Sequence, residues 1–181
     1  MGYQNISNAL AATALAFPFQ IPLKKIKIGL SSTPILSGRL ETIQLNDNKI
    51  LINDTYNANV SSMITAIKVL ETMPGYKMLV VGDMSELGEN TVLYHKMIGN
   101  TANFSKIDEV LSIGDISHEI SQICNNGQHF SNKATLNKYI KNVLLKKTNI
   151  TILVKGSRNA NMEKTVQYII KESKKNVNLV A

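Results

Sequence analysis

The stretch that decides the fold is Ile50-Leu51-Ile52-Asn53-Asp54-Thr55-Tyr56-Asn57-Ala58-Asn59. Its first three residues are apolar and predict a buried strand, and a helical pattern begins near Val60. The polar segment between them therefore forms a strand-to-helix turn, which is where open α/β sheets bind ligands. Asn and Asp also fill turns and cap helices by bonding to local backbone groups. The segment alone leaves both interpretations open.

Short strands and helices alternate on either side of this turn. Strands are expected at 41–45, 49–53, 77–81, 109–113, 129–130 and 150–154, and helices at 60–73, 91–104, 117–124, 133–145 and 160–171. Residues 46–48 predict a hairpin turn between the first two strands. Repeated β-α alternation predicts the α/β class, with a Rossmann-like, mostly parallel, doubly wound sheet.

The first part of the chain has a different pattern. Two helices are expected at 5–17 and 22–30, followed by the turn-rich connection 31–38. Two helices of this length bury too little apolar surface to fold as a domain. We therefore expect a helical element over 1–36 that is the end of another domain, and a complete domain over 37–181.

Composition narrows the class of protein. The 181 residues are 44% hydrophobic and lack the apolar run of about 20 residues that a membrane span needs. The net charge is +7, but the lysines are scattered and not interleaved with aromatic residues, which make up 6% of the chain. A solvated surface is therefore expected in place of a nucleic-acid interface. The single cysteine, Cys124, fits a reducing compartment, so we expect a cytoplasmic protein without membrane or nucleic-acid partners.

Two more polar clusters follow predicted strands, at 82–88 (GDMSELG) and at 155–158 (KGSR). Parallel strands would bring all three clusters to one edge of the sheet. In the third cluster, Lys155 and Arg158 flank the small residues Gly156 and Ser157 at the start of a helix. Two cations beside exposed N–H groups suit a carboxylate or a phosphate, although an ordinary basic loop has the same composition.

Several motifs are absent. The sequence has neither the phosphate loop G-x-x-x-x-G-K-[ST] nor a G-x-G-x-x-G turn after a strand. Its three histidines, His95, His118 and His129, do not lie at metal-ligand spacing from one another or from Cys124. We therefore predict no metal site and assign no catalytic residue in this chain.

Taken together, the segments resemble the Mur ligases, the ATP-dependent amide-forming enzymes of peptidoglycan synthesis. The resemblance rests on residues 5–12 (NISNALAA), 38–41 (GRLE), 53–59 (NDTYNAN), 62–63 (SM), 73–76 (MPGY), 80–88 (VVGDMSELG) and 153–158 (LVKGSR). The Tyr-Asn-Ala-Asn and Gly-Asp-Met-x-Glu-Leu-Gly elements are similar to those of the members that add D-Ala-D-Ala to UDP-N-acetylmuramoyl-tripeptide. The chain resembles the last helices of the central ATPase domain followed by the C-terminal domain. The resemblance places the phosphate loop and the Mg²⁺ ligands in a part that this sequence lacks.

The resemblance also implies roles for individual residues. Nucleotide binding is expected from Asn5, Asn8, Arg39 and Asp54, with the asparagines near adenine, Arg39 near phosphates or ribose, and Asp54 near ribose hydroxyls. D-Ala-D-Ala binding is expected from Tyr56, Asn57, Asn59, Lys155, Gly156, Ser157 and Arg158. Asp83 and Glu86 are secondary candidates for the ammonium end of the dipeptide. Gly38 and its neighbours would form the hinge on which the domain closes.

Three hypotheses remain at this point. The chain is the C-terminal part of such a ligase, inactive without the other domains or working with a separate N-terminal polypeptide. Alternatively, it is a non-catalytic Rossmann-like module that binds a nucleotide or a partner. The third hypothesis is a basic nucleic-acid-binding domain, which the motifs favour least.

Overall fold

The computed structural model describes residues 3–32 and 36–177, with side chains over 6–32 and 36–175. The chain divides into two compact units, 1–36 and 37–181. We describe each unit by itself. The assignment of the first unit to the end of a central ATPase domain stays a prediction.

The first unit consists of helices. α1 (Tyr3–Ala16) runs into the short helix η1 (Phe17–Phe19), and α2 (Leu23–Ser31) follows and contacts α1. Pro18 stands in the first turn of η1, where its missing N–H leaves no bond unmade. Large apolar side chains of this unit are exposed, among them Ile6, Leu10, Leu15, Phe17, Phe19, Leu23 and Ile28. Over the side chains that the structure describes in this unit, 6–32, the two helices therefore enclose no core of their own.

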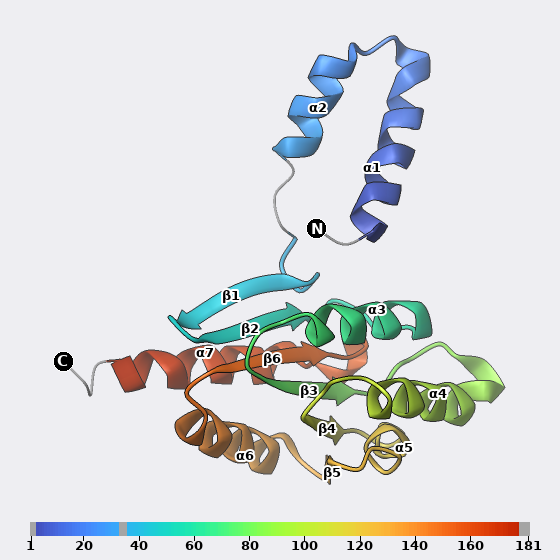
Figure 1. Cartoon of the computed structure of the whole chain (residues 1–181). Coiled ribbons are helices and arrows are strands. Elements are labelled where there is room, and N and C mark those ends of the chain that lie inside the picture. The colour runs from blue at the N-terminus through green and yellow to red at the C-terminus, as the bar shows by residue number, and fades with distance from the viewer. Residues whose placement is uncertain (1–2, 33–35, 178–181) are drawn as a thin grey trace. The chain divides into compact units, whose positions relative to one another are not determined.

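The second unit is built on a six-stranded sheet (Figure 1). Its strands are β1 (Glu41–Asn46), β2 (Lys49–Asp54), β3 (Tyr76–Gly82), β4 (Glu109–Ile113), β5 (Gly127–Phe130) and β6 (Ile150–Lys155). The order across the sheet is β1-β2-β6-β3-β4-β5. Only the β1–β2 pair is antiparallel, so β2 to β6 all end at the same edge.

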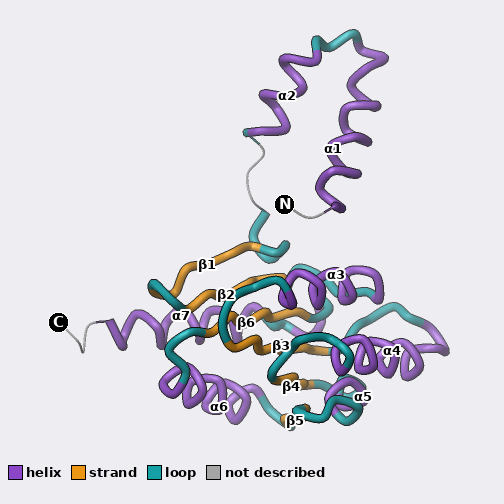
Figure 2. Tube along the Cα trace, viewed as in Figure 1, coloured by secondary structure: helices purple, strands orange, loops and turns teal. Residues whose placement is uncertain are grey.

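Helices cover both faces of the sheet (Figures 1 and 2). They are α3 (Val60–Glu71), α4 (Thr91–Asn103), α5 (His118–Ser121), α6 (Lys133–Lys146) and α7 (Glu163–Val177). One core cluster joins α3, α4 and α5 to one face, and another joins α6 and α7 to the opposite face. The central strands are therefore buried on both sides, which explains their continuous apolar runs. The predicted doubly wound α/β sheet is confirmed.

Two helices, α5 and α7, differ from the prediction by three or more residues at one end, and α7 also continues to Val177, beyond the predicted end at 171. α5 has four residues instead of the predicted 117–124, because the chain tightens at Cys124, whose N–H bonds to Ser121 O, and turns into β5 at Gly127. α7 begins at Glu163, later than predicted, because the short helix η3 (Arg158–Ala160) and the left-handed Asn161 lie between β6 and α7. Both differences arise in connections, where turn geometry overrides apolar periodicity. No helix in the described ranges is long and apolar enough to span a membrane.

Candidate functional site

The three polar clusters lie where β2, β3 and β6 end. In the sheet register Asp54 is paired with Lys155, and Val81 is paired with the same lysine on the other side. The turns that follow these strands therefore start from neighbouring positions. As expected from parallel topology, the structure brings together segments that are about a hundred residues apart in the chain.

A buried ion pair joins the ends of β2 and β6. Lys155 Nζ lies 2.6 Å from Asp54 Oδ2 and also donates to Asn57 O over 2.8 Å. Lys155 is 2% exposed and Asp54 is 8% exposed. Burial lowers the pKa of Lys155, the Asp54 carboxylate opposes this shift, and the positive charge of Arg39 adds to it. The pair holds the polar turn after β2 against the end of β6.

Asparagines of the first cluster serve mainly local structure. Asn59 caps α3: its Oδ1 accepts from Ser62 N, and Ser62 Oγ accepts from Asn59 N. Asn53 Oδ1 accepts from Thr55 Oγ1. Asn57 Oδ1 accepts from the adjacent Ala58 N, but this side chain is exposed. For Asn59 the turn-and-cap interpretation accounts for the side chain, and a direct contact with dipeptide stays a prediction.

Arg39 and Tyr56 are exposed at this edge and contact each other. The Arg39 guanidinium lies 4.3 Å from the centroid of the Tyr56 ring, a distance typical of cation–π contacts. Both residues are exposed, Tyr56 by 52%. A stacked guanidinium keeps N–H groups at its rim for anionic oxygens. The pair is thus available to a ligand, unlike the buried Asp54 and Lys155.

The second cluster contains an acidic residue with a structural task. Asp83 accepts backbone N–H bonds from Asp115, Ile116 and Ser117, at 2.9, 3.1 and 2.7 Å respectively. It thereby fastens the β4–α5 connection to the end of β3. Glu86, in contrast, is exposed and has a left-handed φ of +62°. The proposed contact with an ammonium group remains untested for both carboxylates.

His95, which was not predicted as a site residue, organises the same cluster. His95 is fully buried, its Nε2 accepts from Met84 N at 3.1 Å, and its Nδ1 lies 2.7 Å from Thr91 O. Because Met84 N must donate, Nδ1 carries the proton and donates to Thr91 O. His95 therefore holds the turn that follows β3.

In the third cluster, close packing explains the small residues. A Cβ atom at Gly156 would lie 2.7 Å from Met162 Cγ, so only glycine fits. Ser157 is buried, its N donates to Asp83 O, and its Oγ accepts from Ser85 Oγ at 2.8 Å. Arg158 is exposed, and its nearest acidic partner, Glu163, is 4.0 Å away. Its guanidinium is thus the cation of this cluster that a ligand can reach.

The two asparagines expected near adenine belong to the first unit. Asn8 lies in α1 and is exposed. Asn5 lies in the same helix, but its side chain is outside the described part of the chain. Their roles stay predictions.

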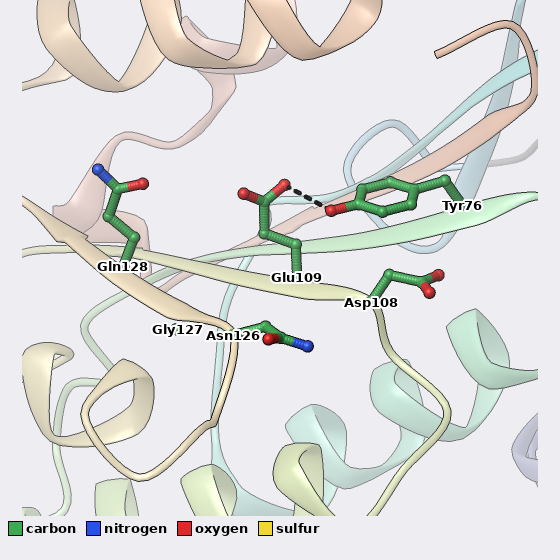
Figure 3. Close-up of a pocket in the computed structure, with 6 residues that line it drawn as sticks. All are labelled: Tyr76, Asp108, Glu109, Asn126, Gly127 and Gln128. Carbon is green, nitrogen blue, oxygen red and sulfur yellow. Dashed lines mark hydrogen bonds between the residues drawn. The ribbon is translucent and has the colours of Figure 1, made fainter. Parts of the chain in front are cut away.

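A separate hollow lies at the opposite, amino-terminal edge of the strands (Figure 3). It has a volume of about 540 Å³ and is lined by Tyr76, Asp108, Glu109, Asn126, Gly127 and Gln128. The Glu109 carboxylate already accepts from the hydroxyls of Tyr76 and Tyr139, and its hydrogen bond raises the pKa of Tyr139 to about 12. None of the predicted site residues with a described side chain lines this hollow. Within the described residues no group of three or more His, Cys, Asp or Glu side chains could hold a metal ion, so no magnesium ligand is assigned here.

Sequence comparison matches most of the chain to a known family. Residues 38–158 match the family model described as "Mur ligase, glutamate ligase domain". The UDP-N-acetylmuramoyl-tripeptide–D-alanyl-D-alanine ligase of Buchnera aphidicola subsp. Acyrthosiphon pisum is 69% identical over 175 residues. That match covers 97% of this chain but 38% of the relative. The chain thus spans less than two fifths of the relative's length.

Structural comparison gives the same result. MurF from Acinetobacter baumannii has a TM-score of 0.86 at 29% identity, covering 94% of this chain and 38% of that one. MurF ligase from Thermotoga maritima, solved in complex with ADP, has a TM-score of 0.71 at 26% identity. It covers 82% of this chain and 34% of its own.

Proposed function

The chain belongs to the Mur ligase family, and we propose that it is the C-terminal part of an ATP-dependent ligase that adds D-Ala-D-Ala to UDP-N-acetylmuramoyl-tripeptide in peptidoglycan synthesis. The observation that carries the proposal is the 69% identity to the Buchnera ligase of that name. The proposed location is the cytoplasm.

The reaction proceeds in two steps. The terminal carboxylate of the tripeptide takes the γ-phosphoryl group of ATP, which gives an acyl phosphate and ADP. The amine of D-Ala-D-Ala then attacks the acyl carbon and loses a proton, and inorganic phosphate leaves. Mg²⁺ would neutralise the phosphate charge, and the residues that hold it would lie outside this chain. The chain's own contribution is to hold two substrates in position.

We assign direct ligand contacts to the exposed residues of the edge. Arg39 would meet the nucleotide phosphates, because its guanidinium is exposed and its N–H groups suit anionic oxygens. Tyr56, Asn57 and Arg158 would meet the dipeptide, with Arg158 taking its carboxylate because its guanidinium is exposed and its contact with Glu163 is long, at 4.0 Å. Asn5 and Asn8 would contribute to the adenine site from the first unit.

Other residues of the edge would act by shape. Lys155 and Ser157 are buried with their polar atoms bonded within the protein, and the exposed Asn59 caps α3 through its Oδ1. Gly156 allows the close approach of β6 to the η3 segment. Each carboxylate oxygen of Asp54 already accepts one hydrogen bond within the protein. A ribose hydroxyl would therefore have to donate to the second lone pair of one of these oxygens. Asp83 and Glu86 would add negative charge near the ammonium group of the dipeptide.

A chimaera tests this proposal. The C-terminal 38% of the Buchnera ligase is replaced by this chain, and phosphate release is measured with ATP, Mg²⁺, D-Ala-D-Ala and the tripeptide precursor. We expect turnover by the chimaera and none by the 181-residue chain alone. In the chimaera, Arg158→Ala should raise the KM for D-Ala-D-Ala by about tenfold to a hundredfold, the equivalent of a charge-assisted hydrogen bond. Lys141→Ala, on the surface of α6, is the control.

The alternatives correspond to definite outcomes. A folded chimaera without ligation would refute the proposal, and nucleotide binding by the chain alone would then favour a non-catalytic binding module. Turnover by this chain alone would show that it carries its own phosphate-activating groups. Turnover only after mixing with a separately made N-terminal portion would support a two-polypeptide enzyme.

A further inference from the structure

The turn 37–41, with which the second unit begins, adopts a demanding backbone conformation. Gly38 and Leu40 both have left-handed φ values, +79° and +48°. Glycine adopts this conformation readily, but a residue with a Cβ atom, such as Leu40, does so only where the surroundings hold it. Something in the structure must therefore fix this turn.

Hydrogen bonds from the end of β2 hold the turn. Leu40 N donates to Asp54 Oδ1 at 3.0 Å, and Tyr56 N donates to Gly38 O at 3.0 Å. The carboxylate of Glu41 adds a third anchor, since its Oε2 accepts from Gly38 N and from Asn53 Nδ2. The turn and the segment 53–56 are thus fastened to each other by bonds in both directions.

Lys155 completes this network without reaching a ligand. Its ammonium group bridges Asp54 Oδ2 and Asn57 O, and the residue is 2% exposed. The positive charge orients the Asp54 carboxylate so that its other oxygen faces Leu40 N. A side chain this deeply buried can influence the edge only through the groups that it holds.

The group that the turn presents is Arg39, between Gly38 and Leu40. Its guanidinium lies over the Tyr56 ring, 4.3 Å from the centroid. Both partners of this stack thus depend on backbone that the ion pair fixes: Arg39 through Leu40 N, and Tyr56 through Asn57 O.

We propose that Asp54 and Lys155 are a positioning pair, which fixes the turn 37–41 and the segment 55–57 so that Arg39 is stacked on Tyr56 at the ligand-binding edge. The part that this stack plays in ligation rests on the proposed function. The positioning itself is a property of the chain and can be measured without substrate.

Amide hydrogen exchange, followed by NMR on the 181-residue chain, tests the pair. Lys155→Met removes the charge and keeps much of the side-chain volume. We expect exchange at the Leu40 and Tyr56 amides to accelerate by at least about tenfold. The amides of Val80 and Leu111 in central strands exchange through unfolding of the whole unit, so their change measures the accompanying loss of global stability. The Arg39 Nε–H resonance should lose the ring-current shift that Tyr56 imposes, and Tyr56→Leu should remove the same shift.

Two further variants keep the test decisive. Lys141→Met breaks another lysine–carboxylate contact, 2.6 Å from Glu172, and should leave Leu40 and Tyr56 as protected as in the parent chain. Asp54→Asn removes the negative charge but retains an acceptor and the side-chain shape. It should accelerate exchange at the same two amides, and it replaces Lys155→Met in the test if that variant does not fold. Unchanged Leu40 and Tyr56 amides in Asp54→Asn, or a retained ring-current shift of Arg39 Nε–H in the folded variants, would overturn the proposal.

The chimaeric ligase separates this inference from the proposed function. In an active chimaera, Asp54→Asn and Lys155→Met should raise the KM for ATP, as Arg39→Ala does, and the KM for D-Ala-D-Ala, as Tyr56→Leu does, whereas Lys141→Met should leave both within about twofold. Selective loss of amide protection in the isolated chain, with a parent chimaera that does not ligate, would refute the proposed function and retain the positioning pair. An active chimaera with unchanged amide protection in both variants would retain the proposed function and refute the positioning pair.

Discussion

Lys155 Nζ and Asp54 Oδ2 lie 2.6 Å apart although the two residues are separated by 101 positions in the sequence. The contact joins the ends of two neighbouring parallel strands, and both residues are almost completely buried. Residue by residue, the sequence assigned one of them to a nucleotide and the other to a dipeptide. Their geometry makes them an interacting pair, so a substitution of one residue also changes the environment of the other.

A double-mutant cycle on the free energy of unfolding should reveal this coupling. Removing one partner leaves an uncompensated buried charge, so Asp54→Leu and Lys155→Met should each destabilise the second unit by about 3–5 kcal/mol. The double variant should be destabilised by much less than the sum, because no charge is left buried. Urea unfolding followed by far-UV circular dichroism measures all four proteins. Additive losses would show that the two side chains act separately.

Gly114 and Gly88 form a matched pair for testing the role of Asp83. Both glycines have positive φ values. A Cβ atom at Gly114 would lie 2.3 Å from Asp83 Oδ1, whereas a Cβ atom at Gly88 would meet no heavy atom of another part of the structure within 4 Å. Gly114→Ala should therefore cost about 2–5 kcal/mol, from backbone strain together with disrupted bonds to Asp83. Gly88→Ala should cost about 1–2 kcal/mol, from strain alone. Urea unfolding of both variants measures the difference, and equal losses would contradict the anchoring role of Asp83.

His129 should titrate below the ordinary histidine value of 6.5, because burial and the neighbouring His118 lower its pKa, while Asp83 opposes the shift. A lowered pKa means that the folded state binds fewer protons than the unfolded state. This contribution to stability is complete above pH 6.5 and falls as the pH drops below it. An NMR titration of the Cε1–H signal measures the pKa. His118→Gln should raise it, and a value above 6.5 in the parent chain would contradict the arrangement.

Cys124 should be unreactive in the folded chain. Its thiol donates to Gly99 O and Ile120 O, and burial raises its pKa to about 11. At pH 8 only about one molecule in a thousand would carry the thiolate, the reactive form. The rate of reaction with a disulfide reagent should therefore be far lower in buffer than in 8 M urea, where the thiol regains its ordinary pKa. Equal rates would show that the α4–α5 region opens readily.

The fold could be predicted largely from apolar patterning. β4 begins and ends at the predicted residues, 109 and 113, because a buried run of strand formers followed by Gly114 leaves little ambiguity. The short α5 could not be predicted, because an apolar period over 117–124 says nothing about the turn that the chain must make to enter β5. Local sequence patterns therefore predict whether an element is a helix or a strand better than they predict the residue at which it ends.

The candidate site was predictable in place but not in detail. Parallel topology alone brings the ends of β2, β3 and β6 together. Which polar groups then bond to each other depends on the register between strands a hundred residues apart. This register cannot be read from continuous apolar runs, because strands buried on both faces lack the alternating pattern that would specify it. Asn59 illustrates the difficulty, since an Asn at a strand-to-helix turn can bind a ligand or cap the helix, and here it caps α3. His95 had no local signal, because both of its partners are backbone groups.

The central position of β6 in the sheet has a consequence for synthesis of the chain. β6 is the last strand in the sequence, yet it lies between β2 and β3, and it is the only strand that joins the β1–β2 hairpin to the β3–β4–β5 ladder. While residues 150–155 are still inside the ribosome, the emerging chain holds two incomplete ladders whose inner edges are unpaired. Such edges invite pairing with other chains. Completion of the sheet must therefore wait for the last strand, so a nascent chain that stalls just before it would be prone to aggregate.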